Sequence, residues 1–74
     1  MPPVPRNVNQ AQAIRTFVRA GRIEIARRGK GSHRLVKMPN GQRLTVPDGI
    51  IKVGTLGDLI KEAGLTVEEF IKLL

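Results

Sequence analysis

The chain has no cysteine, tryptophan or tyrosine, and its 74 residues include two phenylalanines and one histidine. Without cysteine, neither a disulfide nor a thiolate metal site can stabilise the fold. An aromatic content of 3% argues against recognition of nucleic-acid bases by stacking. A single histidine also excludes an acid and base pair made of two imidazoles. If the histidine acts as acid or base, the second role is vacant among histidines, and water or a group of the substrate can fill it.

Long hydrophobic runs are also absent, and no apolar stretch approaches the length of about 20 residues that spans a bilayer. The first six residues lack the apolar core of a signal peptide. We therefore expect a cytoplasmic protein without a membrane partner. Three of the five prolines fall among residues 1 to 5. This composition predicts a flexible tail over residues 1–7 and one small domain over residues 8–74.

Acidic residues are scarce in the first part of the chain. Residues 1–54 contain eleven lysines and arginines but only Glu24 and Asp48 as acids, a net charge of +9. Residues 55–74 contain two lysines and four acids, a net charge of −2. The cationic surface therefore belongs to the first part, which favours a nucleic acid or an acidic protein as partner.

Three helices are predicted, and each begins after an N-capping residue: Asn9, Thr55 and Thr66. The last two resemble capping boxes, because an acid follows three residues later. Gly21 and Gly64 are expected to end the first two helices. The expected core residues are Ile14, Phe17 and Val18 in the first helix, Leu56, Leu59, Ile60 and Ala63 in the second, and Phe70 and Leu73 in the third.

Three strands are predicted between the first two helices, over Arg22 to Ala26, His33 to Met38 and Gln42 to Val46. The turn Pro39-Asn40-Gly41 suits a three-residue hairpin with a glycine bulge. This turn sets Val36 opposite Leu44 and Arg34 opposite Val46. A two-residue turn would reverse the faces, but it would place proline, which lacks an N–H, in a hydrogen-bonded pair. The core face is then Val36, Met38, Leu44 and Val46, and the open face is His33, Lys37, Arg43 and Thr45.

The expected fold is therefore α+β, in the order α-β-β-β-α-α, with helices on one face of a three-stranded antiparallel sheet. The most chemically suggestive segment is the run from Arg27 to Arg34, in which four of eight residues are cationic and two are glycines. Such a segment suits a phosphate-rich partner, and its histidine can exchange protons near neutral pH. The candidate catalytic residue is His33. The candidate RNA contacts are Arg28, Lys30, Gly31, Ser32, Arg34, Lys37 and Arg43.

RNA carries its own nucleophile, since a base that deprotonates the 2′-hydroxyl allows attack on the adjacent phosphorus. His33 suits either this role or that of the acid for the leaving oxygen, and the sequence does not choose between them. Other sites are less well supported. Asp58 and Glu62 are read as helix-surface charges rather than metal ligands, and Ser32 has no triad partner. No nucleotide-binding glycine motif is present. We therefore expect neither a metal nor a small-molecule cofactor.

Five short motifs occur in order along the chain: Gly31-Ser32-His33, Pro39-Asn40-Gly41, Thr45-Val46-Pro47, Gly54-Thr55-Leu56 and Ala63-Gly64-Leu65-Thr66. With these motifs, over roughly residues 9 to 74, the chain resembles the HicA-type mRNA interferase toxins. The resemblance implies a double-stranded-RNA-binding-domain-like fold, metal-free cleavage of mRNA through His33, and neutralisation by a HicB-type antitoxin protein. Arg22 stands where that family often has an aromatic residue, and Gly57 where a basic residue is frequent.

Two other classes of function stay open at this point. One is a non-catalytic RNA-binding domain, which would hold the A-form backbone with the same basic face. The other is a basic protein-interaction module, in which the cations serve an acidic partner and His33 has no catalytic role. We rank the toxin ribonuclease first, the RNA binder second and the interaction module third.

Overall fold

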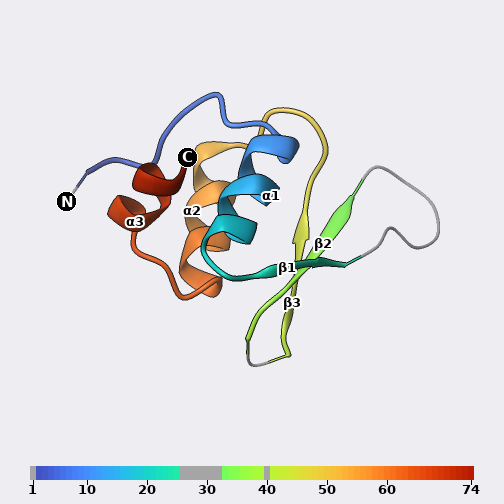
Figure 1. The fold of residues 1–74 in the computed structure, drawn as a ribbon. Coiled ribbons are helices and arrows are strands. Elements are labelled where there is room, and N and C mark those ends of the chain that lie inside the picture. Colours follow the sequence, from blue (N-terminus) through green and yellow to red (C-terminus); the bar gives the residue numbers. More distant parts are fainter. Residues whose placement is uncertain (1, 26–32, 40) are drawn as a thin grey trace.

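The structure is a computed structural model, and it describes residues 2–25, 33–39 and 41–74. Its elements follow the order α-β-β-β-α-α, which confirms the predicted α+β class (Figure 1). They are α1 (Gln10–Arg19), β1 (Ile23–Ile25), β2 (Arg34–Lys37), β3 (Arg43–Val46), α2 (Val53–Glu62) and α3 (Val67–Leu73). The strands form one antiparallel sheet in the order β1-β2-β3.

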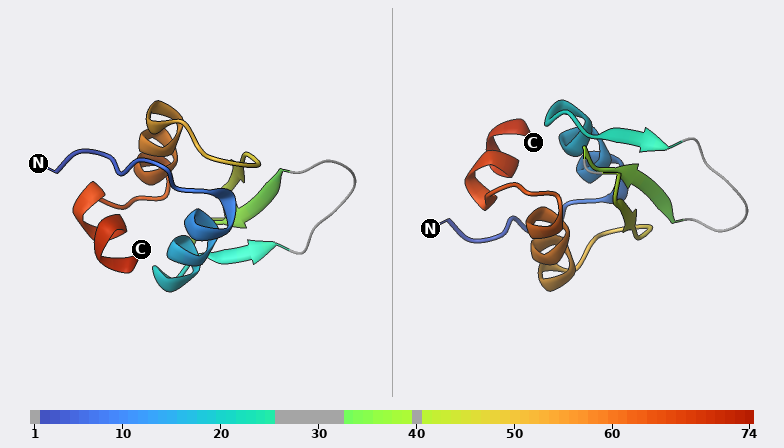
Figure 2. Two further views of the ribbon diagram at one scale, coloured as in Figure 1. Left: turned by 90° about the horizontal axis from the view of Figure 1, so that it is seen from above. Right: turned by 90° about the horizontal axis from the view of Figure 1, so that it is seen from below.

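The three helices lie on one side of the sheet, as the two views of Figure 2 show. Helix α1 contacts β1 and β3, and α2 contacts β3. Helix α3 packs against α1 and α2, so it lies on the side of the helices that is remote from the sheet. No element in the described part of the chain covers the second face of the sheet.

The core lies between the sheet and the helices, and most of its members are branched aliphatic side chains. Phe17 of α1 and Phe70 of α3 are fully buried, and their ring centroids are 5.5 Å apart at an interplanar angle of 56°. This tilted contact fixes α3 against α1. The other core residues are Val8, Ala13, Ile14, Val36, Met38, Leu44, Val46, Ile51, Leu56, Leu59, Ile60 and Ala63.

Two of the three predicted helix starts are confirmed. The side chain of Asn9 accepts a hydrogen bond from the Gln12 N–H (2.8 Å), and that of Thr66 accepts one from the Glu69 N–H (3.1 Å). In both cases the side chain three residues later returns a hydrogen bond to the capping N–H, which completes a capping box. The capping residues predicted at Asn9 and Thr66 are therefore confirmed.

The predicted start of α2 at Thr55 is wrong. The helix begins at Val53 after Lys52, which makes no capping hydrogen bond through its side chain, and Thr55 lies inside the helix. The cause is a contact from the other end of the chain. The Ile51 N–H donates to the Val8 carbonyl (2.8 Å) and the Ile51 side chain is buried, so the chain is fixed up to this point and enters the helix directly afterwards.

The predicted core stripe of α1 also needs a correction, because Val18 is 46% exposed. The buried side of the helix is formed by Ala13, Ile14, Thr16 and Phe17. Its centre lies close to Ala13 and Phe17, which places Val18 at the edge of the stripe. Thr16 is compatible with burial because its hydroxyl donates to the Gln12 carbonyl (2.7 Å).

The N-terminal segment packs against α2 through Val4. Val4 is half-buried against the core, and a Cβ atom at Gly57 would lie 3.4 Å from Val4 Cγ2. Gly57 is therefore the place in α2 where Val4 packs. Flexibility of residues 1–7 stays a prediction.

Candidate nucleic-acid interface

The β2–β3 hairpin has the predicted register, in which Val36 pairs with Leu44 and Arg34 pairs with Val46. The Gly41 N–H donates to the Met38 carbonyl (2.9 Å), and the Met38 N–H donates to the Gln42 carbonyl (2.7 Å). Gly41 has a φ of +89°, the left-handed conformation that the predicted glycine bulge requires. Asn40, the central residue of the turn, lies outside the described residues.

This register sorts the side chains as predicted. The four predicted core residues of the hairpin are buried, whereas His33, Lys37, Arg43 and Thr45 are exposed. Lys37 pairs with Arg43 on one side and with Ile23 on the other. Paired residues share a face of the sheet, so two cations and one isoleucine form a row across the open face.

His33 immediately precedes β2 and is exposed. The described strand pairs begin at Arg34, so the face of the sheet that His33 occupies stays a prediction from the alternation of side chains. The structure brings two predicted site residues, Lys37 and Arg43, to the open face, and His33 is exposed directly before β2. Four predicted contacts lie outside the described residues: Arg28, Lys30, Gly31 and Ser32. The same holds for Ala26, the predicted end of the first strand.

Arg34 lies on the other face of the sheet. It pairs with Val46, a core residue, and its Nε donates to Glu24 Oε2 (2.9 Å) while its Nη2 forms an ion pair with the same oxygen. Both side chains are about one-third exposed, so the pair lies at the rim of the core. Arg34 is thus separated from Lys37 and Arg43, with which the sequence grouped it.

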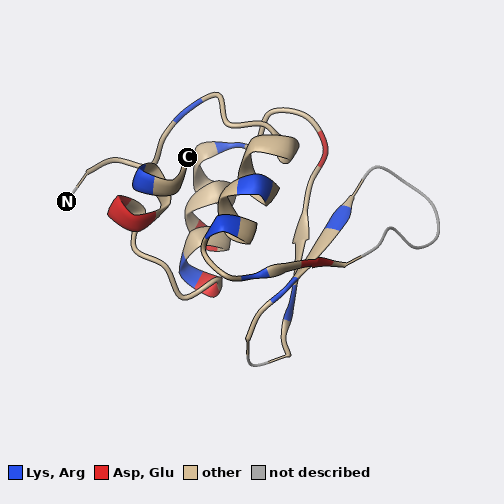
Figure 3. Cartoon of the chain, viewed as in Figure 1, with Lys and Arg blue, Asp and Glu red and all other residues tan. Residues whose placement is uncertain are grey.

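The distribution of charge along the fold agrees with the split seen in the sequence (Figure 3). Lysines and arginines occur on α1 and on the strands, whereas acids gather towards the end of α2 and on α3.

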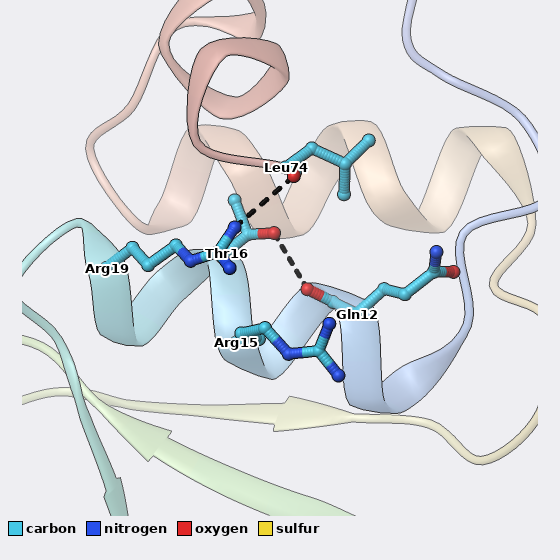
Figure 4. A pocket seen from close by; sticks show the side chains of 5 residues that line it. All are labelled: Gln12, Arg15, Thr16, Arg19 and Leu74. Carbon is cyan, nitrogen blue, oxygen red and sulfur yellow. Dashed lines mark hydrogen bonds between the residues drawn. The ribbon is translucent and has the colours of Figure 1, made fainter.

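On α1, Arg15 and Arg19 are exposed. Arg19 Nη1 donates to the carbonyl oxygens of Leu73 (2.7 Å) and Leu74 (3.3 Å), so this arginine holds the end of α3 (Figure 4).

Arg22 has a structural role that sequence reasoning missed. Its guanidinium donates through Nη1 to the Ala20 carbonyl (2.6 Å) and through Nη2 to the Ala63 carbonyl. Ala20 and Ala63 are the C-capping residues of α1 and α2, where carbonyl groups lack partners within the helix. No motif or spacing in the sequence indicated this capping role.

Two further properties concern the described residues only. No group of three or more histidine, aspartate or glutamate side chains there is placed to hold a metal ion. Within the same ranges, no helix has the length and apolar character that crossing a membrane requires.

Comparison with known proteins agrees with the topology and the motifs. Residues 11–65 match the family model described as "HicA toxin of bacterial toxin-antitoxin". A search of the curated proteins found no match. The matched segment contains α1 except its first residue, the whole sheet and α2, which is more than half of the chain. The chain therefore belongs to the HicA toxin family of bacterial toxin–antitoxin systems.

Proposed function

We propose that this toxin is a metal-independent endoribonuclease that cleaves mRNA with His33 as its general acid or base. The observation that carries the proposal is the position of the one histidine. It is exposed directly before β2, the strand whose Lys37 pairs with Arg43 on the sheet face that the described helices leave open. An imidazole beside cations is the minimum equipment for cleaving a phosphodiester that supplies its own nucleophile.

The reaction follows from these groups. Neutral His33 accepts the 2′-hydroxyl proton, the 2′-oxygen attacks the adjacent phosphorus in line, and the bond to the 5′-oxygen breaks while water gives a proton to this departing oxygen. The products are a 2′,3′-cyclic phosphate and a 5′-hydroxyl. In the alternative assignment, protonated His33 gives its proton to the leaving 5′-oxygen and water accepts the proton of the 2′-hydroxyl. The protons balance in both assignments, and a single histidine performs one of the two roles in each cleavage step.

The cations serve binding and the transition state. Lys37 and Arg43 are directly opposite each other on neighbouring strands, and both are exposed. Two like charges in a cross-strand pair repel each other, which disfavours the pair as a purely structural feature. A phosphate between them removes this repulsion. His33 lies four residues before Lys37, about 13 Å away along the strand direction, so the RNA backbone would run across the face from this pair to His33. Arg28, Lys30, Gly31 and Ser32 would extend this contact from the segment before His33.

As a member of the family, the chain has an antitoxin as its partner. We propose that this antitoxin is of the HicB type, that it is acidic where it meets the toxin, and that it covers the open sheet face. RNA and antitoxin would then exclude each other, because both need Lys37 and Arg43.

The test of the nuclease activity uses the purified chain and an unstructured RNA in the presence of a chelator. We expect cleavage, and we expect His33→Ala to lower the rate about 100-fold or more without altering the circular dichroism spectrum. Lys52→Ala is a suitable control, because Lys52 is an exposed cation outside the sheet. Undiminished cleavage by His33→Ala would remove His33 from the mechanism, and cleavage only after addition of a divalent ion would refute metal independence. Binding without cleavage would favour the RNA-binding alternative.

A further inference from the structure

The open face of the sheet is apolar at one side and cationic at the other. On β1, Ile23 is 65% exposed, although isoleucine is normally among the most buried residue types. Ile25 is half-buried and pairs with Leu35 of β2, which is also half-buried. Because directly paired residues share a face, Ile23, Ile25 and Leu35 form one continuous patch, which we call the aliphatic patch.

The aliphatic patch does not suit RNA. Isoleucine and leucine have no hydrogen-bonding group for phosphates, and they lack the flat face on which an unpaired base stacks. An exposed group of aliphatic side chains bordered by cations is instead typical of a protein interface, with an apolar centre and a polar rim. Along the open face, Ile23 is the direct neighbour of Lys37. One surface therefore combines a part that RNA can use with a part that it cannot.

The charges on this face indicate the occupant. In the described part of the sheet, the acid is Glu24, and its pairing with Val36 assigns it to the helix side, where it binds Arg34. The described charged residues of the open face are thus Lys37 and Arg43. A second copy of this chain, with a net charge of +7, would be repelled on approach. An acidic protein with apolar residues at the centre of its contact surface is complementary in both respects.

We propose that the antitoxin docks on the open sheet face and buries the aliphatic patch, with carboxylates opposite Lys37 and Arg43. This inference rests on the proposed function for the identity of the competing ligand, RNA. Its new content is that the two ligands overlap only in part. The cations are common to both, whereas Ile23, Ile25 and Leu35 serve the antitoxin alone. Substitution of the aliphatic patch therefore separates inhibition from catalysis.

The decisive variant is Ile23→Thr, which keeps a β-branched side chain suited to a strand but replaces an apolar branch with a hydroxyl. Ile50→Thr is the matched control. Ile50 is also exposed, at 61%, but it lies in the connection between β3 and α2. The probe is the cognate antitoxin of this toxin, and its affinity for the toxin is measured by calorimetry without RNA. We expect Ile23→Thr to weaken binding about tenfold and Ile50→Thr to leave it within about twofold.

RNA cleavage is measured on the same proteins. We expect Ile23→Thr to cleave at about the wild-type rate and to resist inhibition by the antitoxin, with the inhibition curve displaced by the same factor as the affinity. Leu35→Thr should behave in the same way. Equal antitoxin affinities of Ile23→Thr, Ile50→Thr and wild type would overturn the docking inference.

Two other results would also overturn the inference. A loss of cleavage in folded Ile23→Thr would mean that the aliphatic patch belongs to the RNA surface. A wild-type dimer that Ile23→Thr dissociates would mean that a second copy occupies this face. Failure of the wild-type protein to cleave any RNA would refute the proposed nuclease, but it would leave the calorimetric result, and thus the docking inference, intact.

Discussion

Arg22 ties the end of α2 to the beginning of β1, because its guanidinium donates to the carbonyl of Ala63. The same group binds the Ala20 carbonyl, so one side chain satisfies the C-terminal ends of two helices. A cation is also favoured there by the partial negative charge at helix C-termini. The Nε atom of Arg22 is buried without a hydrogen-bond partner, so the desolvation free energy of this N–H group is not recovered and offsets part of the stabilisation.

The first prediction is that Arg22→Ala lowers the free energy of unfolding by about 2 kcal/mol, because two charged hydrogen bonds are lost and helix carbonyls are left unsatisfied. Urea denaturation of wild type and variant measures the difference. Arg15→Ala is the control, since Arg15 is an exposed arginine of α1. Equal losses in the two variants would show that the capping contacts contribute nothing.

The second prediction concerns α3. Phe70 is fully buried against Phe17, so Phe70→Ala should cost about 3 to 5 kcal/mol, enough to threaten the folding of so small a domain. Thr66→Ala should cost about 1 kcal/mol, because it removes the N-cap. Thermal and urea melts of both variants test this order. A nearly neutral Phe70→Ala would mean that α3 is not required for the core.

The third prediction compares a glycine inside α2 with a glycine that follows this helix. Gly57 lies inside the helix, and a Cβ atom there would make an ordinary contact with Val4, so Gly57→Ala should stabilise the fold by about 0.5 to 1 kcal/mol. Gly64 has a φ of +77°, and a Cβ atom there would lie 3.3 Å from Arg22 Nη2. Gly64→Ala should therefore destabilise by about 1 kcal/mol or more. Shifts of opposite sign in the urea midpoint are the expected result.

The fourth prediction addresses the shared cations. The double variant Lys37→Glu, Arg43→Glu should weaken both RNA and antitoxin binding. It should also lower the slope of log K against log salt for RNA by about 1 for each lost phosphate contact. The matched control is Lys61→Glu, Lys72→Glu, which changes the net charge equally on exposed residues of α2 and α3. Filter binding at several salt concentrations measures the slopes. Equal effects of the two double variants would show that only net charge matters.

The sheet was the part of the fold most open to prediction from sequence. A proline and a glycine at fixed positions of one turn determine the hairpin register, and the register then assigns each side chain to a face. Local signals of the same kind located the caps Asn9 and Thr66. Residues close in sequence make all of these contacts, which is why the pattern was sufficient.

Contacts between distant residues explain what the sequence did not predict. The start of α2 depends on a hydrogen bond between Ile51 and Val8, and the ion pair between Arg34 and Glu24 joins β2 to β1. The role of Arg22 depends on Ala63, 41 residues away. Neither the spacing of residues nor the hydrophobic periodicity predicts a contact between residues so far apart in the sequence. For the candidate site, the positions of Lys37 and Arg43 followed from the register of β2 and β3. The aliphatic patch was not predicted, because it depends on how β1 pairs with β2.

The family match ends at residue 65, but the cooperative unit extends beyond it on both sides. Asn9, which caps α1, and Val8, which fixes the start of α2, precede the matched segment, and Phe70 follows it. A fragment cut to residues 11–65 would expose one whole side of Phe17 and leave α1 without its cap. The minimal expressible domain is therefore longer than the segment by which the family is recognised, and truncated forms of this toxin should be lost to proteolysis rather than persist as small nucleases.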